Sequence, residues 1–218
     1  RNNMVHFIYG PIGSGKTSVL LKYLESDINQ GRKAFVIVPE QETVAAERKI
    51  VSLFPTSAQL NVEVLNFSRL CNRIFRTYGG LSYNFATKPI KSLIMWNTLR
   101  ELSPMLEEYR STDVADFSLT QKMLSATQEL KAYCISPEKL DLTCSKIDSN
   151  SSIYGKLRDV SLIYSSYNNQ INEYFSDSSD DISKAIDTVK DKEFFSDSNV
   201  YIDSFAGFTK QEFDFIFK

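Results

Sequence analysis

The chain has 218 residues, of which 42% are hydrophobic and 24% are charged, and its formal net charge is −2. This composition is ordinary for a globular protein and provides for one large or two small hydrophobic cores. The small net charge excludes binding of nucleic acid over the whole surface, so any DNA contact is expected to be local. No stretch is apolar over the roughly 18–20 residues that a membrane helix needs, so no membrane association is expected.

The cysteines give no sign of a metal site or of a disulfide framework. Cys71, Cys134 and Cys144 are spread along the chain, and no two of them have CxxC spacing. Reduced thiols are typical of cytoplasmic proteins, and free cysteine is among the residue types most often buried. The first residues also lack the basic start and apolar run of an export signal. We therefore expect a cytoplasmic protein with buried thiols.

Short apolar runs alternate with helical periods in the first 80 residues. The runs are too short for helices and predict buried strands at residues 5–9, 34–38 and 62–67. Pro39 ends the second run. Apolar residues at helical spacing predict helices at residues 17–30, 44–54 and 70–78. Strands that alternate with helices are typical of an α/β fold, in which helices cover a parallel sheet.

The pattern changes between residues 88 and 192, where no run resembles a strand. Helix signals take over, such as Ser136-Pro137, in which serine caps a helix and proline takes its first position. A long amphipathic stretch follows at residues 153–175. Strand character returns at residues 199–203, and Thr209-x-x-Glu212 predicts the cap of a last helix. We therefore predict a discontinuous core of residues 1–85 and 196–218, interrupted by a helical insertion of residues 86–195.

One motif carries chemistry. Residues 10–17 match the pattern G-x-x-x-x-G-K-[ST] in full, follow a predicted strand and open a predicted helix. Glycines let such a loop turn tightly, so that backbone N–H groups point at phosphate oxygens, and the helix N-terminus adds partial positive charge. The predicted nucleotide-binding residues are Gly10, Pro11, Ile12, Gly13, Ser14, Gly15, Lys16 and Thr17.

The end of this motif predicts how ATP and Mg²⁺ are held. The Lys16 ammonium would lie between the β- and γ-phosphates, and the Thr17 hydroxyl would coordinate Mg²⁺. Asp203 ends the run at residues 199–203 and is the expected second Mg²⁺ ligand, although it could also merely end a strand. These features predict a P-loop NTPase fold, RecA-like, with a large all-helical insertion.

The residue after Asp203 bears on catalysis. Hydrolysing enzymes of this class commonly have glutamate there to position water, whereas this chain has Ser204. This difference weakens the case for ATP hydrolysis and leaves the case for ATP binding unchanged. We therefore assign no catalytic residue from the sequence.

Polar residues after the second and third predicted strands form a further group of candidates. Gln41 follows the second strand at the sheet edge where open α/β folds bind ligands, or it belongs to a helix N-terminus. Asn66, Ser68 and Arg69 follow the third strand on the same edge. They could contact DNA or a nucleotide, or they could cap the following helix, and capping is favoured.

Several segments together resemble one family. Residues 10–17 resemble helicase motif I, and residues 35–41 and 64–70 resemble later elements of UvrD/Rep-like superfamily 1 helicases. Residues 201–212 are most similar to the AddB-type chains of AddAB/RexAB-type ATP-dependent helicase/deoxyribonucleases. Ser204 departs from the glycine that is more common in that family. The helical middle of the chain carries little of the resemblance.

The resemblance implies an N-terminal helicase-like domain from a larger protein. Complexes of that family process double-strand DNA breaks for recombinational repair, and their AddA-type chain is the main motor and the heterodimer partner. The AddB-type chain would help to recognise DNA and would carry a C-terminal nuclease with an iron–sulfur cluster, for which this sequence has no cysteine cluster. The implied cofactors of this segment are ATP and Mg²⁺, its implied partners are DNA and the AddA-type chain, and weak or absent hydrolysis is expected.

Two other functions are compatible with the same loop. A glycine-rich loop before a leucine-rich helix also resembles thymidine-type nucleoside kinases, but those need a zinc-binding cysteine cluster, and the cysteine spacing is wrong here. An active DNA translocase motor is the other alternative. It needs a catalytic glutamate and a second domain that supplies arginines across the cleft.

Overall fold

The computed structural model describes residues 5–80, 84–110 and 117–217. Contacts within the chain divide it into two compact units, and each is described by itself. The sheet unit comprises Arg1–Gly79 and Asp187–Phe208, and the helical unit comprises Gly80–Ile186 and Thr209–Lys218. The sequence placed the borders at residues 85 and 196, and it assigned residues 209–218 to the core.

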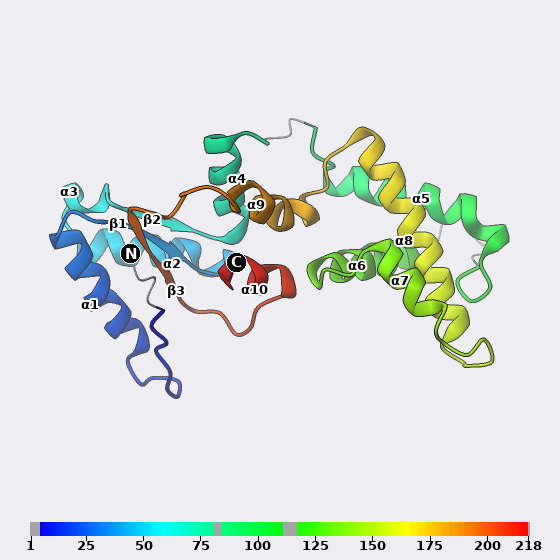
Figure 1. Cartoon of the computed structure of the whole chain (residues 1–218), viewed down its shortest axis with the longest axis horizontal. Coiled ribbons are helices and arrows are strands. Elements are labelled where there is room, and N and C mark those ends of the chain that lie inside the picture. The colour runs from blue at the N-terminus through cyan, green and yellow to red at the C-terminus, as the bar shows by residue number, and fades with distance from the viewer. Residues whose placement is uncertain (1–4, 81–83, 111–116, 218) are drawn as a thin grey trace. The chain divides into compact units, whose positions relative to one another are not determined.

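A parallel sheet of three strands organises the sheet unit (Figure 1). The strands are β1 (Lys33–Ile37), β2 (Val62–Leu65) and β3 (Ser198–Ile202), in the order β2-β1-β3. Register places Ile37 of the central strand beside Leu65 on one side and Ile202 on the other. The predicted strands at 34–38, 62–67 and 199–203 are therefore confirmed, and so is the α/β class.

Helices α1 (Lys16–Asn29) and α2 (Thr43–Leu53) pack against one face of this sheet. Successive side chains of a strand point to opposite faces, and alternate residues of β1 enter this core. The buried cluster on this face consists of Leu24, Ile28, Ala34, Val36, Val38, Ile50 and Phe54. Both helices thus bury an apolar stripe against the central strand, which accounts for the helical periods read from the sequence.

The opposite face of β1 carries an aromatic cluster. The Phe35 ring stacks on Phe194 with 5.7 Å between ring centroids and meets Phe195 edge-on at 5.6 Å. Tyr78 also meets Phe194 edge-on and comes from the end of α4 (Phe67–Tyr78). The remaining short elements of the sheet unit are η1 (Glu40–Glu42) and α3 (Thr56–Gln59), both between β1 and β2.

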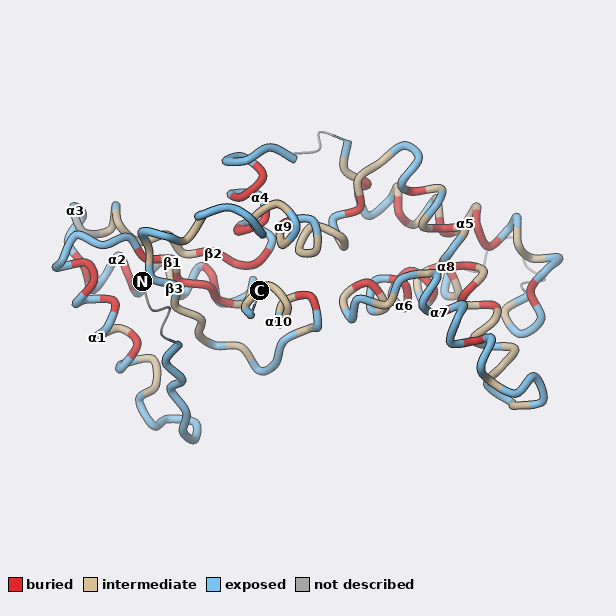
Figure 2. Tube along the Cα trace, viewed as in Figure 1, coloured by how far each residue is buried: buried red, intermediate tan, exposed pale blue. Residues whose placement is uncertain are grey.

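The predicted strand at residues 5–9 is wrong. These residues form no strand and are exposed, Tyr9 to 93% (Figure 2). Both edges of β1 are occupied by β2 and β3, so an additional strand would have to pair at an outer edge of the sheet. Instead the His6 ring lies 6.1 Å from the Tyr23 ring of α1. An apolar run shows that a segment can form a strand, but it does not specify the edge that would pair with it.

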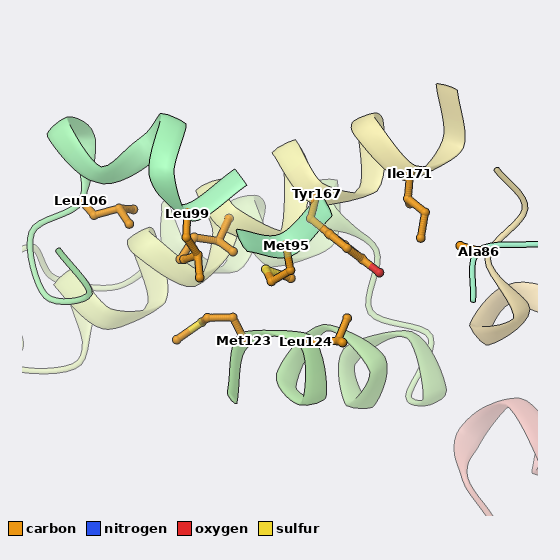
Figure 3. Packing of buried hydrophobic residues seen from close by; sticks show 9 residues of the cluster. Ala86, Met95, Leu99, Leu106, Met123, Leu124, Tyr167 and Ile171 are labelled. Atoms are coloured by element: carbon orange, nitrogen blue, oxygen red, sulfur yellow. The ribbon is translucent and has the colours of Figure 1, made fainter. Parts of the chain in front are cut away.

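Helices dominate the helical unit, and several of them enclose its core (Figure 3). The core helices are α5 (Lys88–Leu102), α6 (Phe117–Ala132) and α8 (Tyr154–Tyr174). Their buried side chains include Met95, Met123 and Tyr167. The other elements are η2 (Ser103–Met105), α7 (Pro137–Cys144), η3 (Ser178–Asp180), α9 (Asp181–Val189), which extends into the sheet unit, and α10 (Lys210–Phe217). Among the described residues of this unit, the one extended pairing is a bridge between Phe85 and Ser176.

Two of the local helix signals are confirmed. The Ser136 hydroxyl accepts a hydrogen bond from the Lys139 N–H at 3.3 Å, with proline in the first turn of α7. Thr209 and Glu212 form a capping box before α10, because each side chain accepts a hydrogen bond from the other's backbone N–H. The prediction of buried thiols is confirmed for two of the three cysteines. Cys71 and Cys144 are buried, but Cys134 is exposed at the end of α6, with φ of 55°.

Candidate nucleotide-binding site

The loop at residues 10–17 has the backbone that its glycines allow. Gly13 and Gly15 have φ of 83° and 84°, a region that other residues rarely adopt. At Gly10 the constraint is space, since a Cβ there would lie 2.6 Å from the Ser14 hydroxyl oxygen. The Ser14 N–H donates to the Pro11 carbonyl at 3.2 Å and closes the turn. The backbone angle at Gly13 and Gly15 and the lack of space at Gly10 therefore explain why glycine occupies these three positions.

Helix α1 begins directly after this turn, at Lys16. Its N-cap residue is Gly15, so no side chain caps the first backbone N–H groups of the helix. Uncapped N–H groups and the helix dipole favour an anion at this position. The Lys16 ammonium donates to the carbonyls of Gly10 and Pro11, each at 2.8 Å, and is thereby kept beside the loop. The residue types and the backbone are chemically suited to a phosphate group.

The carboxyl ends of the parallel strands form a second part of the candidate site. Asp203 follows β3 directly, and its N–H donates to the Ile37 carbonyl at 3.1 Å. Asn66 follows β2 in the same way, so the register of the sheet brings Asn66 and Asp203 to one edge. Ligands of open α/β sheets bind outside this edge.

The predicted Mg²⁺ ligands Thr17 and Asp203 both belong to the sheet unit. A hydroxyl and a carboxylate are hard oxygen ligands, which suit Mg²⁺ when phosphate and water complete its coordination. No cluster of three or more histidine, cysteine, aspartate or glutamate residues that could hold a metal occurs in the described part of the chain. Coordination of one Mg²⁺ by Thr17 and Asp203 stays a prediction.

Asn66 is a helix cap, which confirms the favoured of its two interpretations. Its side-chain oxygen accepts the Arg69 N–H at 2.8 Å, and the residue is buried at the start of α4. The Arg69 guanidinium instead donates to the Glu47 carboxylate at 2.7 Å, and both side chains are about half exposed. Gln41 in η1 and Ser68 in the first turn of α4 are exposed. A DNA or nucleotide contact by any of these residues stays a prediction.

A buried carboxylate that the sequence reasoning missed joins α1 to β3. Asp27 accepts hydrogen bonds from the Asn199 amide and the Tyr201 hydroxyl, both at 2.5 Å. Burial and the hydrogen bond to Asp27 raise the pKa of Tyr201 above its ordinary value, so the phenol remains protonated. Asp27 lies between Leu24 and Ile28 on the buried stripe of α1. An aspartate within that stripe is the signal that could have identified it.

These features define the class of the sheet unit: an α/β domain with a glycine-rich, anion-compatible loop at the start of its first helix. Residues 7–218 match the family described as ADDB, N-terminal, and the chain therefore belongs to that family. No described helix is long and apolar enough to cross a membrane.

The chain is also similar to longer proteins, each named as the B-type component of an ATP-dependent helicase/deoxyribonuclease. It is 30% identical over 217 residues to the one from Ruminiclostridium cellulolyticum and 31% identical over 215 residues to the one from Acetivibrio thermocellus. The one from Clostridioides difficile is 29% identical over 217 residues. These matches cover 97–98% of the chain and 19% of each relative, so the chain spans about one fifth of their length.

Proposed function

We propose that the chain is the ATP-binding, helicase-like module of a helicase/nuclease complex that processes double-strand DNA breaks in recombinational repair. In this proposal its sheet is of the P-loop, RecA-like type. Its partners are DNA and the AddA-type chain of the heterodimer, and its cofactors are ATP and Mg²⁺. The observation that carries the proposal is the loop at residues 10–17, with left-handed Gly13 and Gly15 before an uncapped helix, in a chain of the ADDB N-terminal family.

Each residue of the loop would have a defined task in this proposal. Backbone N–H groups of the turn and of the first turn of α1 would bind phosphate oxygens. The Lys16 ammonium would exchange its two carbonyl partners for the β- and γ-phosphates. Mg²⁺ would neutralise phosphate charge while Thr17 and Asp203 hold it. Binding of the triphosphate therefore depends mostly on backbone geometry and on one lysine.

We infer that this module hydrolyses ATP weakly or not at all by itself. Ser204 follows Asp203 in place of a carboxylate, and its neutral hydroxyl is too weakly basic to act as a general base. Bound ATP would then serve to hold the sheet unit in a defined state while the complex holds DNA. Hydrolysis is accordingly a poor first test of the proposal, and binding is the better one.

The test is Mg²⁺-dependent ATP binding measured by isothermal titration calorimetry on three versions of the chain. Lys16→Ala removes the proposed phosphate contact, and Lys22→Ala removes the same charge from an exposed position of α1. We expect Lys16→Ala to weaken binding by about tenfold or more, since a charged hydrogen bond contributes about 1.5–3 kcal/mol. Lys22→Ala should bind like the native chain. A folded native chain that does not bind ATP, or equal binding by all three, would contradict the proposal.

A further inference from the structure

The helical unit contains a half-open cavity of about 430 Å³ that none of the preceding assignments uses, and its lining residues Lys88, Ser125 and Gln128 are exposed. Pockets that hold small ligands are typically about 300–1,000 Å³. The cavity lies between α5, α6 and η3, and most of the side chains that line it are polar. Its polar lining residues are Lys88, Lys91, Gln121, Ser125, Gln128 and Ser178. No aspartate or glutamate is among the described residues that line it.

Hydrogen-bond donors predominate in this lining. The Lys91 ammonium has three N–H groups, of which one donates to Asp177 at 2.6 Å and one to the Ser178 hydroxyl at 3.1 Å. Among the described residues, the third N–H of Lys91 and the hydroxyl proton of Ser178 have no hydrogen-bond partner, so both remain for a ligand. Lys88 at the start of α5 adds a second ammonium group with its own N–H donors, and Gln128 adds an amide from α6. Such a lining is complementary to a group that only accepts hydrogen bonds.

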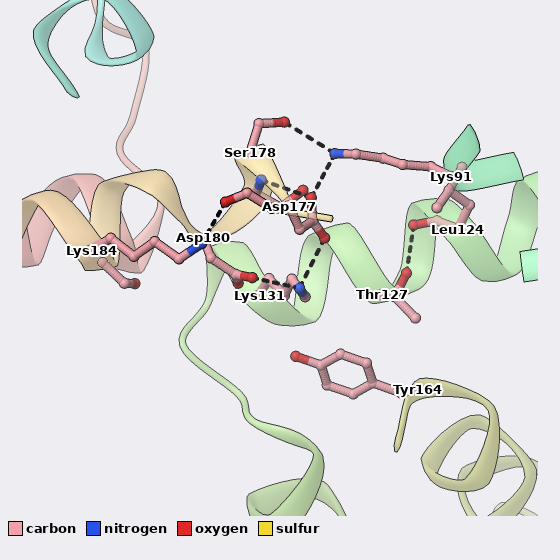
Figure 4. A network of polar contacts seen from close by, with 12 residues as sticks. Lys91, Leu124, Thr127, Lys131, Tyr164, Asp177, Ser178, Asp180 and Lys184 are labelled. Atoms are coloured by element: carbon pink, nitrogen blue, oxygen red, sulfur yellow. Dashed lines mark hydrogen bonds and ion pairs between the residues drawn. The ribbon is translucent and has the colours of Figure 1, made fainter. Parts of the chain in front are cut away.

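A buried ion cluster beside the cavity keeps Lys91 in position (Figure 4). Asp177 bridges the ammonium groups of Lys91 and Lys131, and Lys131 also pairs with Asp180 at 2.8 Å. Burial by itself would raise the pKa of Asp177, but Lys131, together with hydrogen bonds from Lys91 and the Ser179 N–H, holds that pKa well below its usual value. The two lysines and two aspartates of the cluster balance in charge, and the neighbouring Asp181 carboxyl is offset by the Lys184 ammonium on α9. Lys88 therefore leaves the cavity with a surplus of positive charge.

We propose that this cavity binds a phosphate group, supplied either by a DNA strand or by a nucleotide. A phosphate presents several acceptor oxygens and a negative charge, which matches free N–H and O–H donors, a surplus ammonium and the absence of a lining carboxylate among the described residues. Lysine binds phosphate as a compact charge without a fixed direction, and the hydroxyl and amide groups supply directed hydrogen bonds. The proposal does not depend on nucleotide binding at residues 10–17.

The experiment follows the side-chain amide signals of Gln121 and Gln128 by NMR during titration with phosphate-bearing probes. The chain carries Lys16→Ala, so that the proposed triphosphate loop does not contribute. The probes are a 15-nucleotide oligothymidylate, ATP and inorganic phosphate. The test variant is Lys88→Gln, which leaves the ion cluster intact. Its matched control is Lys122→Gln, which removes the same charge from an exposed position of α6 outside the cavity.

At least one probe should shift both amide signals, and Lys88→Gln should weaken its binding about tenfold, whereas Lys122→Gln should not. If oligothymidylate shifts the signals and ATP and phosphate do not, the ligand is a DNA strand. For that ligand, Lys88→Gln should also make the negative slope of log K against log salt concentration less steep by about 0.7. If ATP shifts the signals and oligothymidylate does not, the ligand is a nucleotide, and a shift by inorganic phosphate shows that the phosphate group is sufficient for binding. The proposal is overturned if no probe shifts the signals, or if the two variants bind equally.

Discussion

The two units of the chain use polar residues in opposite ways. In the helical unit the ion cluster of Lys91, Lys131, Asp177 and Asp180 is largely buried, and its two positive and two negative charges balance. In the sheet unit the loop at residues 10–17 is largely exposed, and its distinctive feature is left-handed backbone at Gly13 and Gly15. The first arrangement stabilises a fold, while the second is the one that we propose presents N–H groups to a ligand. Substitutions should separate these two roles.

The largest effect on stability is expected from Asp177→Asn in the helical unit. It leaves the buried ammonium groups of Lys91 and Lys131 without their shared carboxylate, and breaking a buried ion pair destabilises by about 3–5 kcal/mol. Urea unfolding followed by circular dichroism measures the loss. Asp141→Asn, at an exposed position of α7, is the control. ATP binding at the sheet unit should persist. A fall in the free energy of unfolding of less than about 1 kcal/mol would contradict the account.

The same substitution should change the dependence of stability on pH. The pKa of Asp177 is lower in the folded chain than in the unfolded chain. Its contribution is therefore present above the unfolded pKa, about 3.9, and is lost as pH falls through the folded value. The stability difference between the native chain and Asp177→Asn should be constant at neutral pH and should shrink below about pH 4. A difference that grows on acidification would show the opposite sign.

Asp27→Asn tests whether a buried carboxylate in the sheet unit has the same stabilising role. It weakens the acceptor for Asn199 and Tyr201, so a loss of about 2 kcal/mol is expected in urea unfolding. Glu25→Gln, at an exposed position of the same helix, should be neutral. Equal stability of the two variants would mean that Asp27 does not fasten α1 to β3.

Gly15→Ala should change binding more than stability, and it thereby sharpens the contrast between the units. Alanine at φ of 84° costs about 1–2 kcal/mol of stability, and relief of that strain would reorient the first N–H groups of α1. We expect ATP binding by calorimetry to be lost. Gly207→Ala is the matched control, because its backbone φ is ordinary and its Cβ would meet no atom within 4 Å. Unchanged ATP binding by a folded Gly15→Ala chain would rule out a role for this backbone.

The smallest effect is expected from Ser136→Ala, which removes the cap of α7. The loss should be about 1 kcal/mol in thermal unfolding, since an exposed cap satisfies a single backbone N–H group. Ser136→Asp should retain the native stability, because aspartate caps equally well. A loss that aspartate does not restore would mean that the serine acts by some other contact.

The sequence predicted those parts of the fold that local patterns determine. The cap at Ser136 and the box of Thr209 and Glu212 were readable because their partners are three residues apart. The strands that became β1, β2 and β3 were readable as apolar runs. The strand predicted at residues 5–9 does not form, because strand formation depends on a pairing edge that an apolar run does not encode.

The sequence predicted the part of the candidate site whose residues are contiguous, and it missed contacts between residues that are far apart in the chain. The loop at residues 10–17 is a contiguous motif, and the structure gives Gly13 and Gly15 left-handed backbone that suits the expected tight turn. Asp27 meets Tyr201 across 174 positions, and Lys91 meets Asp177 across 86. Contacts this distant along the chain depend on tertiary packing. A single sequence offers at most the hint of an acidic residue on an apolar helical stripe.

The most direct test of the central claim is to locate bound ATP in the chain. Addition of ATP with Mg²⁺ to ¹⁵N-labelled protein should shift the backbone amide signals of Gly13, Gly15 and Thr17 in a saturable way, because these N–H groups would meet phosphate oxygens. The same addition to the Lys16→Ala chain should leave those signals in place at equal concentration. Amide signals of the loop that do not move in a folded native chain would contradict the claim that this loop binds a nucleoside triphosphate.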